Sequence, residues 1–93
     1  MNVTIKFRTQ VRVAAGTDCI NIDLNEHATF SELILVLKDR SMNRLNSILF
    51  NDDQKLSGSL LFTLNNEKQI RERDNIVFKD GDVITIFSPI SGG

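Results

Sequence analysis

The spacing of apolar residues changes along this chain from strand-like to helix-like, and this change constrains the fold more than any other feature. Apolar and polar residues alternate over residues 3–7 and again over residues 18–24, which predicts two strands with one buried face each. After them the apolar residues follow the i, i+3, i+4, i+7 spacing of one helical stripe. The stripe consists of Phe30, Leu33, Ile34 and Leu37. This order predicts a helix packed on one face of a sheet.

The start of the helix is marked by Thr29-Phe30-Ser31-Glu32. This run fits a capping box, in which the side chains of Thr29 and Glu32 each bond to the other residue's backbone amide. We predict the main helix at residues 30–43. Leu45, Ile48 and Leu49 favour one more helical turn beyond it.

Three further strands are predicted in the second half of the chain. Residues 60–64 and 83–87 are rich in apolar, β-branched and aromatic residues, which favours strands. Residues 69–71 are predicted to form a short edge strand. Asn65-Asn66 and Asp80-Gly81 indicate turns, because these residue types tolerate the backbone angles that tight turns require.

Two connecting segments are less regular. Residues 9–16 either extend the first strand or form a short helical turn closed by Gly16, and we favour the turn. Residues 71–79 are predicted to be mostly loop, anchored by Ile76 and Phe78. The resulting order, β-β-α-β-β-β, is an α+β fold with one main helix on one face of a mixed sheet.

Composition excludes several classes of function. A chain of 93 residues makes one domain, residues 1–93. Its net charge of −1 provides no basic surface for nucleic acid or an anionic membrane, and no apolar run approaches the ~20 residues of a membrane span. The single cysteine, Cys19, excludes an internal disulfide and favours a reducing compartment, so we expect a cytoplasmic location.

The last strand is expected to present two different faces. Ile84 and Ile86 share the face that points to the core, whereas Thr85 and Phe87 point to the opposite face, which no helix covers. An exposed Phe87 beside Leu61 would form an apolar patch, and such patches often bind partner proteins. The alternative is a loop that folds over Phe87 and shields it.

Residues 88–93 are predicted to form a flexible C-terminal tail. Pro89 has no N–H to donate to a ladder and therefore ends the strand. Gly92 and Gly93 lack side chains, so this segment can enter a narrow tunnel and leaves its last carbonyl unhindered. The five residues 89–93 reach about 17 Å when extended. From these residues alone, a frayed terminus without a function is an equal alternative.

Other candidate chemistry in the chain is weaker. Cys19 with His27, the single histidine, would make a nucleophile–base pair only if the fold brought them together, and we expect a strand thiol and a surface imidazole instead. The acidic pairs at 52–53 and 80/82 lack the ligand spacing of a known cation loop, so no metal site is predicted. No glycine-rich phosphate loop is present, which argues against ATP binding by this chain itself.

Four segments taken together resemble the ubiquitin-like β-grasp sulfur carriers, and most of all the small subunit of molybdopterin synthase. They are Gln10-Val11-Arg12, Leu64-Asn65-Asn66, Asp80-Gly81-Asp82 and Phe87-Ser88-Pro89-Ile90-Ser91-Gly92-Gly93. The resemblance covers almost the whole chain. The sequence departs from the family pattern at Ser88, where a proline is usual.

The resemblance implies a carrier that is not catalytic alone. A ubiquitin-activating-type adenylyltransferase would use ATP to adenylate the Gly93 carboxylate, and a persulfide enzyme would supply the sulfur of a thiocarboxylate. The large subunit of molybdopterin synthase would then take up the tail. Beyond Gly92 and Gly93, partner-binding residues are expected at Phe87, Ser88, Pro89, Ile90, Ser91, Leu61 and Arg12. No cofactor is expected to bind to the chain itself.

Several alternatives stay open at this point. Carriers for thiamin synthesis and tRNA thiolation also end in Gly-Gly, so the sulfur acceptor is not fixed. The same activated carboxylate would serve a protein modifier that forms isopeptide bonds with lysines. A β-grasp interaction module with an inert tail is the third possibility.

Overall fold

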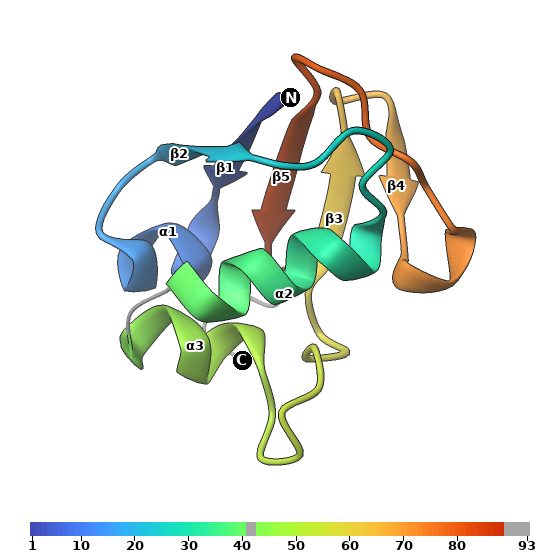
Figure 1. The fold of residues 1–93 in the computed structure, drawn as a ribbon. Coiled ribbons are helices and arrows are strands. Elements are labelled where there is room, and N and C mark those ends of the chain that lie inside the picture. Colours follow the sequence, from blue (N-terminus) through green and yellow to red (C-terminus); the bar gives the residue numbers. More distant parts are fainter. Residues whose placement is uncertain (41–42, 89–93) are drawn as a thin grey trace.

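The structure is a computed structural model that describes residues 1–40 and 43–88. In chain order its elements are β1 (Asn2–Phe7), α1 (Thr9–Ala15), β2 (Cys19–Asp23), α2 (Phe30–Arg40), α3 (Asn43–Leu49), β3 (Leu61–Leu64), β4 (Lys68–Ile70), the 3-10 helix η1 (Glu72–Asp74) and β5 (Val83–Phe87). The strands form one sheet, across which α2 lies (Figure 1).

The sheet is mixed, with the strand order β2-β1-β5-β3-β4. The first and last strands, β1 and β5, are parallel neighbours in the middle of the sheet, and the other three pairings are antiparallel. The predicted α+β class, with one main helix on a mixed sheet, is confirmed.

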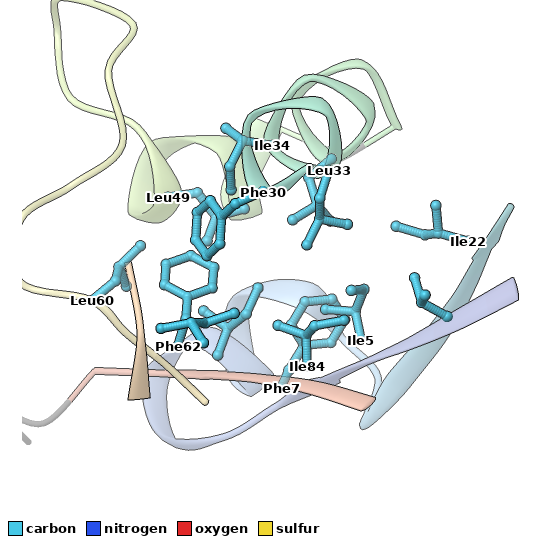
Figure 2. Close-up of a cluster of buried hydrophobic side chains, with 14 of the residues drawn as sticks. Ile5, Phe7, Ile22, Phe30, Leu33, Ile34, Leu49, Leu60, Phe62 and Ile84 are labelled. Atoms are coloured by element: carbon cyan, nitrogen blue, oxygen red, sulfur yellow. The ribbon is translucent and has the colours of Figure 1, made fainter. Parts of the chain in front are cut away.

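The core lies between α2 and the sheet, as the helical stripe predicts. Phe30, Leu33, Ile34 and Leu37 are all buried. Figure 2 shows side chains of α2 directed toward those of the central strands, with Leu49 of α3 beside them. The rings of Phe30 and Phe62 pack edge to face with their centroids 5.0 Å apart, a favourable arrangement for aromatic pairs.

The start of α2 contains one of the two bonds of the predicted capping box. The Glu32 amide donates to the Thr29 hydroxyl at 3.4 Å, as expected of a helix cap. The structure describes α2 as far as Arg40, and Asn43 belongs to a separate helix, α3, so the prediction that the main helix extends to residue 43 is wrong. The additional turn predicted from Leu45, Ile48 and Leu49 is confirmed as part of α3.

The ambiguous segment 9–16 is helical, as favoured. Gly16 closes α1 with φ of 75°, and its N–H donates to the Arg12 carbonyl at 3.0 Å. Strand extension is excluded because Val11 is buried while Val13 is 62% exposed, so these two apolar residues do not share a face.

The remaining connections also follow the prediction. Asn65 and Asn66 make the turn after β3 with φ of 53° and 57°. The edge strand β4 is shifted by one residue from the predicted range, because Arg71 instead precedes η1 as its cap. Phe78 is buried and anchors the loop before β5.

Candidate functional site

The candidate site is built on β5, the strand that leads to the C-terminal residues. Both edges of β5 are paired. Phe7 of β1 lies opposite Ile86 on one side, and Leu61 of β3 lies opposite Phe87 on the other. Because a central strand is held on both sides, the position of its last residue is well fixed relative to the core.

The start of β5 is held by an amide side chain from the β3–β4 turn. The Asn65 Oδ1 atom accepts from the Val83 N–H at 2.7 Å, and its Nδ2 atom donates to Asp82 Oδ1 at 3.0 Å. Asp82 in turn accepts from the Lys79 N–H at 2.8 Å. Asn65 thereby ties the turn after β3 to the loop that leads into β5.

On the face of the sheet opposite α2 lie Leu61, Thr63, Thr85 and Phe87, which we call the open-face patch. Leu61 and Phe87 are brought together as cross-strand neighbours, as are Thr63 and Thr85. Phe87 was expected to be exposed and is instead half-buried. Leu61 of β3 is its cross-strand neighbour on this face.

A shallow depression of about 440 Å³ lies next to this patch. It is lined by Arg8, Thr63, Thr85 and Phe87 together with residues 66–69 of the β3–β4 hairpin. Thr85 is 6% exposed, and its hydroxyl has no hydrogen-bond partner among the described residues. Buried polar groups in native proteins usually have partners, so this hydroxyl is a notable exception.

Ser88 follows β5 and is bound to Thr9, the first residue of α1. Its backbone N–H donates to the Thr9 hydroxyl oxygen at 3.0 Å. The other predicted tail residues, Pro89, Ile90, Ser91, Gly92 and Gly93, lie outside the described residues.

Arg12 lies on α1 and not on the sheet. Its Nε atom is 3.5 Å from Asp18 Oδ1, and both side chains are largely exposed. An exposed ion pair of this kind contributes little stability. The guanidinium of Arg12 is therefore accessible without being part of the open-face patch.

Cys19 and His27 are both exposed and lie on different elements, Cys19 on β2 and His27 in the loop before α2. No contact between them occurs in the part of the chain that the structure describes. Within residues 1–40 and 43–88, no three acidic, histidine or cysteine side chains gather as a metal site would require.

Two residues of the site, Asn65 and Thr9, are not marked as functional candidates by any sequence pattern. Asn65 was recognised as a turn residue, but nothing local indicates that its amide reaches the start of β5. Thr9 was part of an ambiguous segment, and its contact with Ser88 joins residues 79 positions apart. Parallel neighbouring strands end at the same edge of a sheet. Thr9 and Ser88, which follow the ends of β1 and β5, therefore lie close together.

A mixed sheet with a helix across one face, and with parallel first and last strands at its centre, defines the ubiquitin-like β-grasp class. The model of the ThiS family matches residues 5–93. The chain belongs to this family of ubiquitin-like sulfur carriers.

Solved structures agree with this assignment. Small archaeal modifier protein 1 of Haloferax volcanii has a TM-score of 0.85 at 22% identity, with 100% of each chain covered. The protein of the same name from Methanosarcina acetivorans has a TM-score of 0.76 at 27% identity, covering 99% of this chain and 96% of that one.

A third similar structure is a complex of subunits 1 and 2 of the molybdopterin-converting factor from Helicobacter pylori. The matched chain has a TM-score of 0.66 at 26% identity, with 100% of each chain covered. Among curated proteins, the comparison finds no match to this chain. None of the described helices has the length and apolar character needed to cross a membrane.

Proposed function

We propose that this chain is a sulfur carrier that serves as the small subunit of a molybdopterin synthase. Its Gly93 carboxylate becomes a thiocarboxylate and donates sulfur to a cyclic pyranopterin precursor. The observation that carries this proposal is that the ThiS family match extends through the last residue and so includes both terminal glycines.

The chemistry starts with activation, because a carboxylate is a poor electrophile. An adenylyltransferase of the ubiquitin-activating type joins the Gly93 carboxylate to AMP from ATP and releases pyrophosphate. The terminal sulfur of an enzyme persulfide then attacks the carbonyl carbon and AMP leaves, which gives an acyl disulfide. A thiol then attacks the enzyme's sulfur in that disulfide, so that the S–S bond breaks, the Gly93 thiocarboxylate is released and the enzyme cysteine is left in a disulfide with the thiol. Since Gly92 and Gly93 have no side chains, the attack on this carbonyl is unhindered.

The partner surface in this proposal is the open-face patch followed by the tail residues Ser88, Pro89, Ile90 and Ser91. A half-buried aromatic side chain at the end of a rigid strand is a suitable anchor for a partner. Arg12, weakly paired with Asp18, is available to a partner carboxylate.

The choice of acceptor pathway is supported by the Helicobacter pylori structure, in which the matched subunit is found with subunit 2 of the molybdopterin-converting factor. The 26% identity over the whole of both chains makes an equivalent large subunit the first partner to test. Thiamin synthesis and tRNA thiolation are alternative sulfur acceptors for the same thiocarboxylate.

A second candidate function is protein modification, in which Gly93 forms isopeptide bonds with lysines. It is favoured by the 27% identity to the small archaeal modifier protein 1 of Methanosarcina acetivorans. Both functions use the same adenylate and differ only in the nucleophile that attacks it.

Intact mass spectrometry tests the proposal directly. The chain is incubated with ATP, its activating enzyme and a sulfur donor, and replacement of one oxygen by sulfur adds about 16 Da, a change fixed by covalent composition. The control is a variant extended by one residue beyond Gly93, which should gain no mass.

Adding the large subunit and the pyranopterin precursor should return the mass to its original value. An unchanged mass with an enzyme that activates other carriers would argue for an inert interaction module. Heavier conjugates in cell extract that disappear when Gly93 is deleted would favour the modifier function instead.

A further inference from the structure

The parallel ladder between β1 and β5 ends at a side chain. The Arg8 N–H donates to the Ile86 carbonyl at 3.0 Å, which continues the register that pairs Phe7 with Ile86. In a regular parallel ladder the next hydrogen bond would run from the Ser88 N–H to the Arg8 carbonyl. In this protein the Thr9 hydroxyl takes the place of that direct bond.

The hydroxyl bridges the two backbone groups. Its oxygen accepts from the Ser88 N–H at 3.0 Å and lies 2.7 Å from the Arg8 carbonyl oxygen, to which it donates. The Ser88 carbonyl oxygen is 3.2 Å from the same hydroxyl and is an alternative acceptor for its single hydrogen. The hydroxyl therefore holds the Ser88 N–H, while its single hydrogen goes to the carbonyl of either Arg8 or Ser88.

Thr9 adopts an uncommon backbone conformation to make this bridge. Its φ of 55° lies in the left-handed region, which is unfavourable for a β-branched residue. Among the described non-glycine residues with positive φ, Thr9 is the β-branched one. Such strain persists where surrounding contacts fix it, and it concentrates at functional positions.

The bridge is separate from the helix that Thr9 begins. The described partners of the hydroxyl are Arg8 and Ser88, and neither lies within α1. The cap position of α1 is Arg8, which makes no side-chain capping bond. A role limited to starting α1 therefore does not account for the hydroxyl.

We propose that Thr9 is a positioning residue for the C-terminal tail, in that its hydroxyl holds Ser88, five residues before Gly93. This inference rests on the proposed function, since it concerns delivery of the Gly93 carboxylate to the activating enzyme. Thr9 does not touch the reacting carbonyl.

The physical consequence is a defined starting point for the tail. With Ser88 held, five residues span at most about 17 Å beyond it. Without the hydroxyl, Ser88 gains conformational freedom that it must lose again when a partner binds, and this loss weakens binding. Loss of the hydroxyl should raise the KM of the activating enzyme for this chain and leave kcat unchanged.

Three substitutions separate this role from a structural one. Thr9→Gly removes the hydroxyl and also relieves the strain, so the fold should be at least as stable as the natural protein. Thr9→Ser keeps the hydroxyl and serves as the matched control. Thr9→Val, which keeps the shape of the side chain, provides the same test should glycine loosen the start of α1.

The first measurement is amide hydrogen exchange of Ser88 in the full chain alone. Exchange should accelerate about three- to tenfold in Thr9→Gly and Thr9→Val, the effect of losing one net hydrogen bond, and should stay near the natural rate in Thr9→Ser. The second is steady-state adenylation, in which the KM for the chain should rise by a similar factor in the first two variants and be restored in the third.

Each outcome decides one part of the inference. Unchanged exchange at Ser88 in Thr9→Gly and Thr9→Val would show that the hydroxyl does not hold the tail. Faster exchange with an unchanged KM would overturn the positioning role. If the natural chain is not adenylated by an enzyme active on other carriers, the proposed function fails, whereas the exchange result for Thr9 still stands.

Discussion

Alternate residues of β5 have different surroundings, and this alternation links the core to the candidate site. Ile84 and Ile86 are fully buried, whereas Phe87 is half-buried on the opposite face. The burial of the two isoleucines fixes the strand and so holds Phe87, the proposed partner anchor, in place. A rigid anchor loses little conformational freedom on binding, which favours affinity.

Phe87→Ala is expected to weaken binding to the large synthase subunit by more than about 1 kcal/mol, because it removes a buried aromatic contact at the proposed interface. Isothermal titration calorimetry would measure the change in Kd. Val77→Ala is the control, because Val77 is 49% exposed in the loop before β5, away from the open-face patch. Equal affinity of the natural chain and Phe87→Ala would remove Phe87 from the proposed interface.

At the scale of secondary-structure elements, the β3–β4 turn and the loop before β5 act as one unit. Asn65 connects them through hydrogen bonds to Val83 and Asp82. These bonds set where β5 begins. Because side chains alternate along a strand, a shift of one residue would place Phe87 in the core and Ile86 on the open face.

Asn65→Gly should lower the free energy of unfolding by about 1–2 kcal/mol, because it removes both hydrogen bonds while tolerating the positive φ of that position. Denaturant unfolding followed by circular dichroism would measure the change. Asn66→Gly is the matched control, because Asn66 also has a positive φ. It should change the free energy of unfolding by less than about 0.5 kcal/mol. Equal effects of the two variants would mean that the amide of Asn65 contributes nothing to stability.

At the scale of the whole molecule, one aromatic cluster connects the helix, the sheet and the loop before β5. Phe30 of α2 contacts Phe62 of β3, with ring centroids 5.0 Å apart, and its ring centroid lies 6.5 Å from that of Phe78. All three side chains are buried. The position of the open-face patch therefore depends on the core packing on the other side of the sheet.

Phe30→Ala should lower the free energy of unfolding by about 3–5 kcal/mol, because it removes a buried ring and leaves a cavity among three elements. Thermal and denaturant unfolding would measure it. Leu35→Ala on the same helix is the control, because Leu35 is 65% exposed and should change stability by less than about 0.5 kcal/mol. A loss below 1 kcal/mol for Phe30→Ala would contradict the central position assigned to this ring.

Most element types in this fold could be predicted from the sequence. Strand and helix periods are local properties, so the stripe of α2 and the alternation of β1 and β5 identified their buried faces correctly. The boundary between α2 and α3 was missed, because apolar spacing continues through residue 49 and no proline or glycine marks the break. The face assignment placed Leu61 and Phe87 on the same side of the sheet, but whether Phe87 is exposed or shielded could not be predicted from the sequence.

The sequence by itself determined which faces are buried and which residues end the chain, since both depend only on side-chain types and their order. Only the tertiary structure decided that β1 and β5 are parallel neighbours, that Asn65 holds the start of β5 and that Thr9 holds Ser88. These contacts join residues far apart in the chain. Their energies depend on where the core places the strands, and no local pattern of residues encodes that placement.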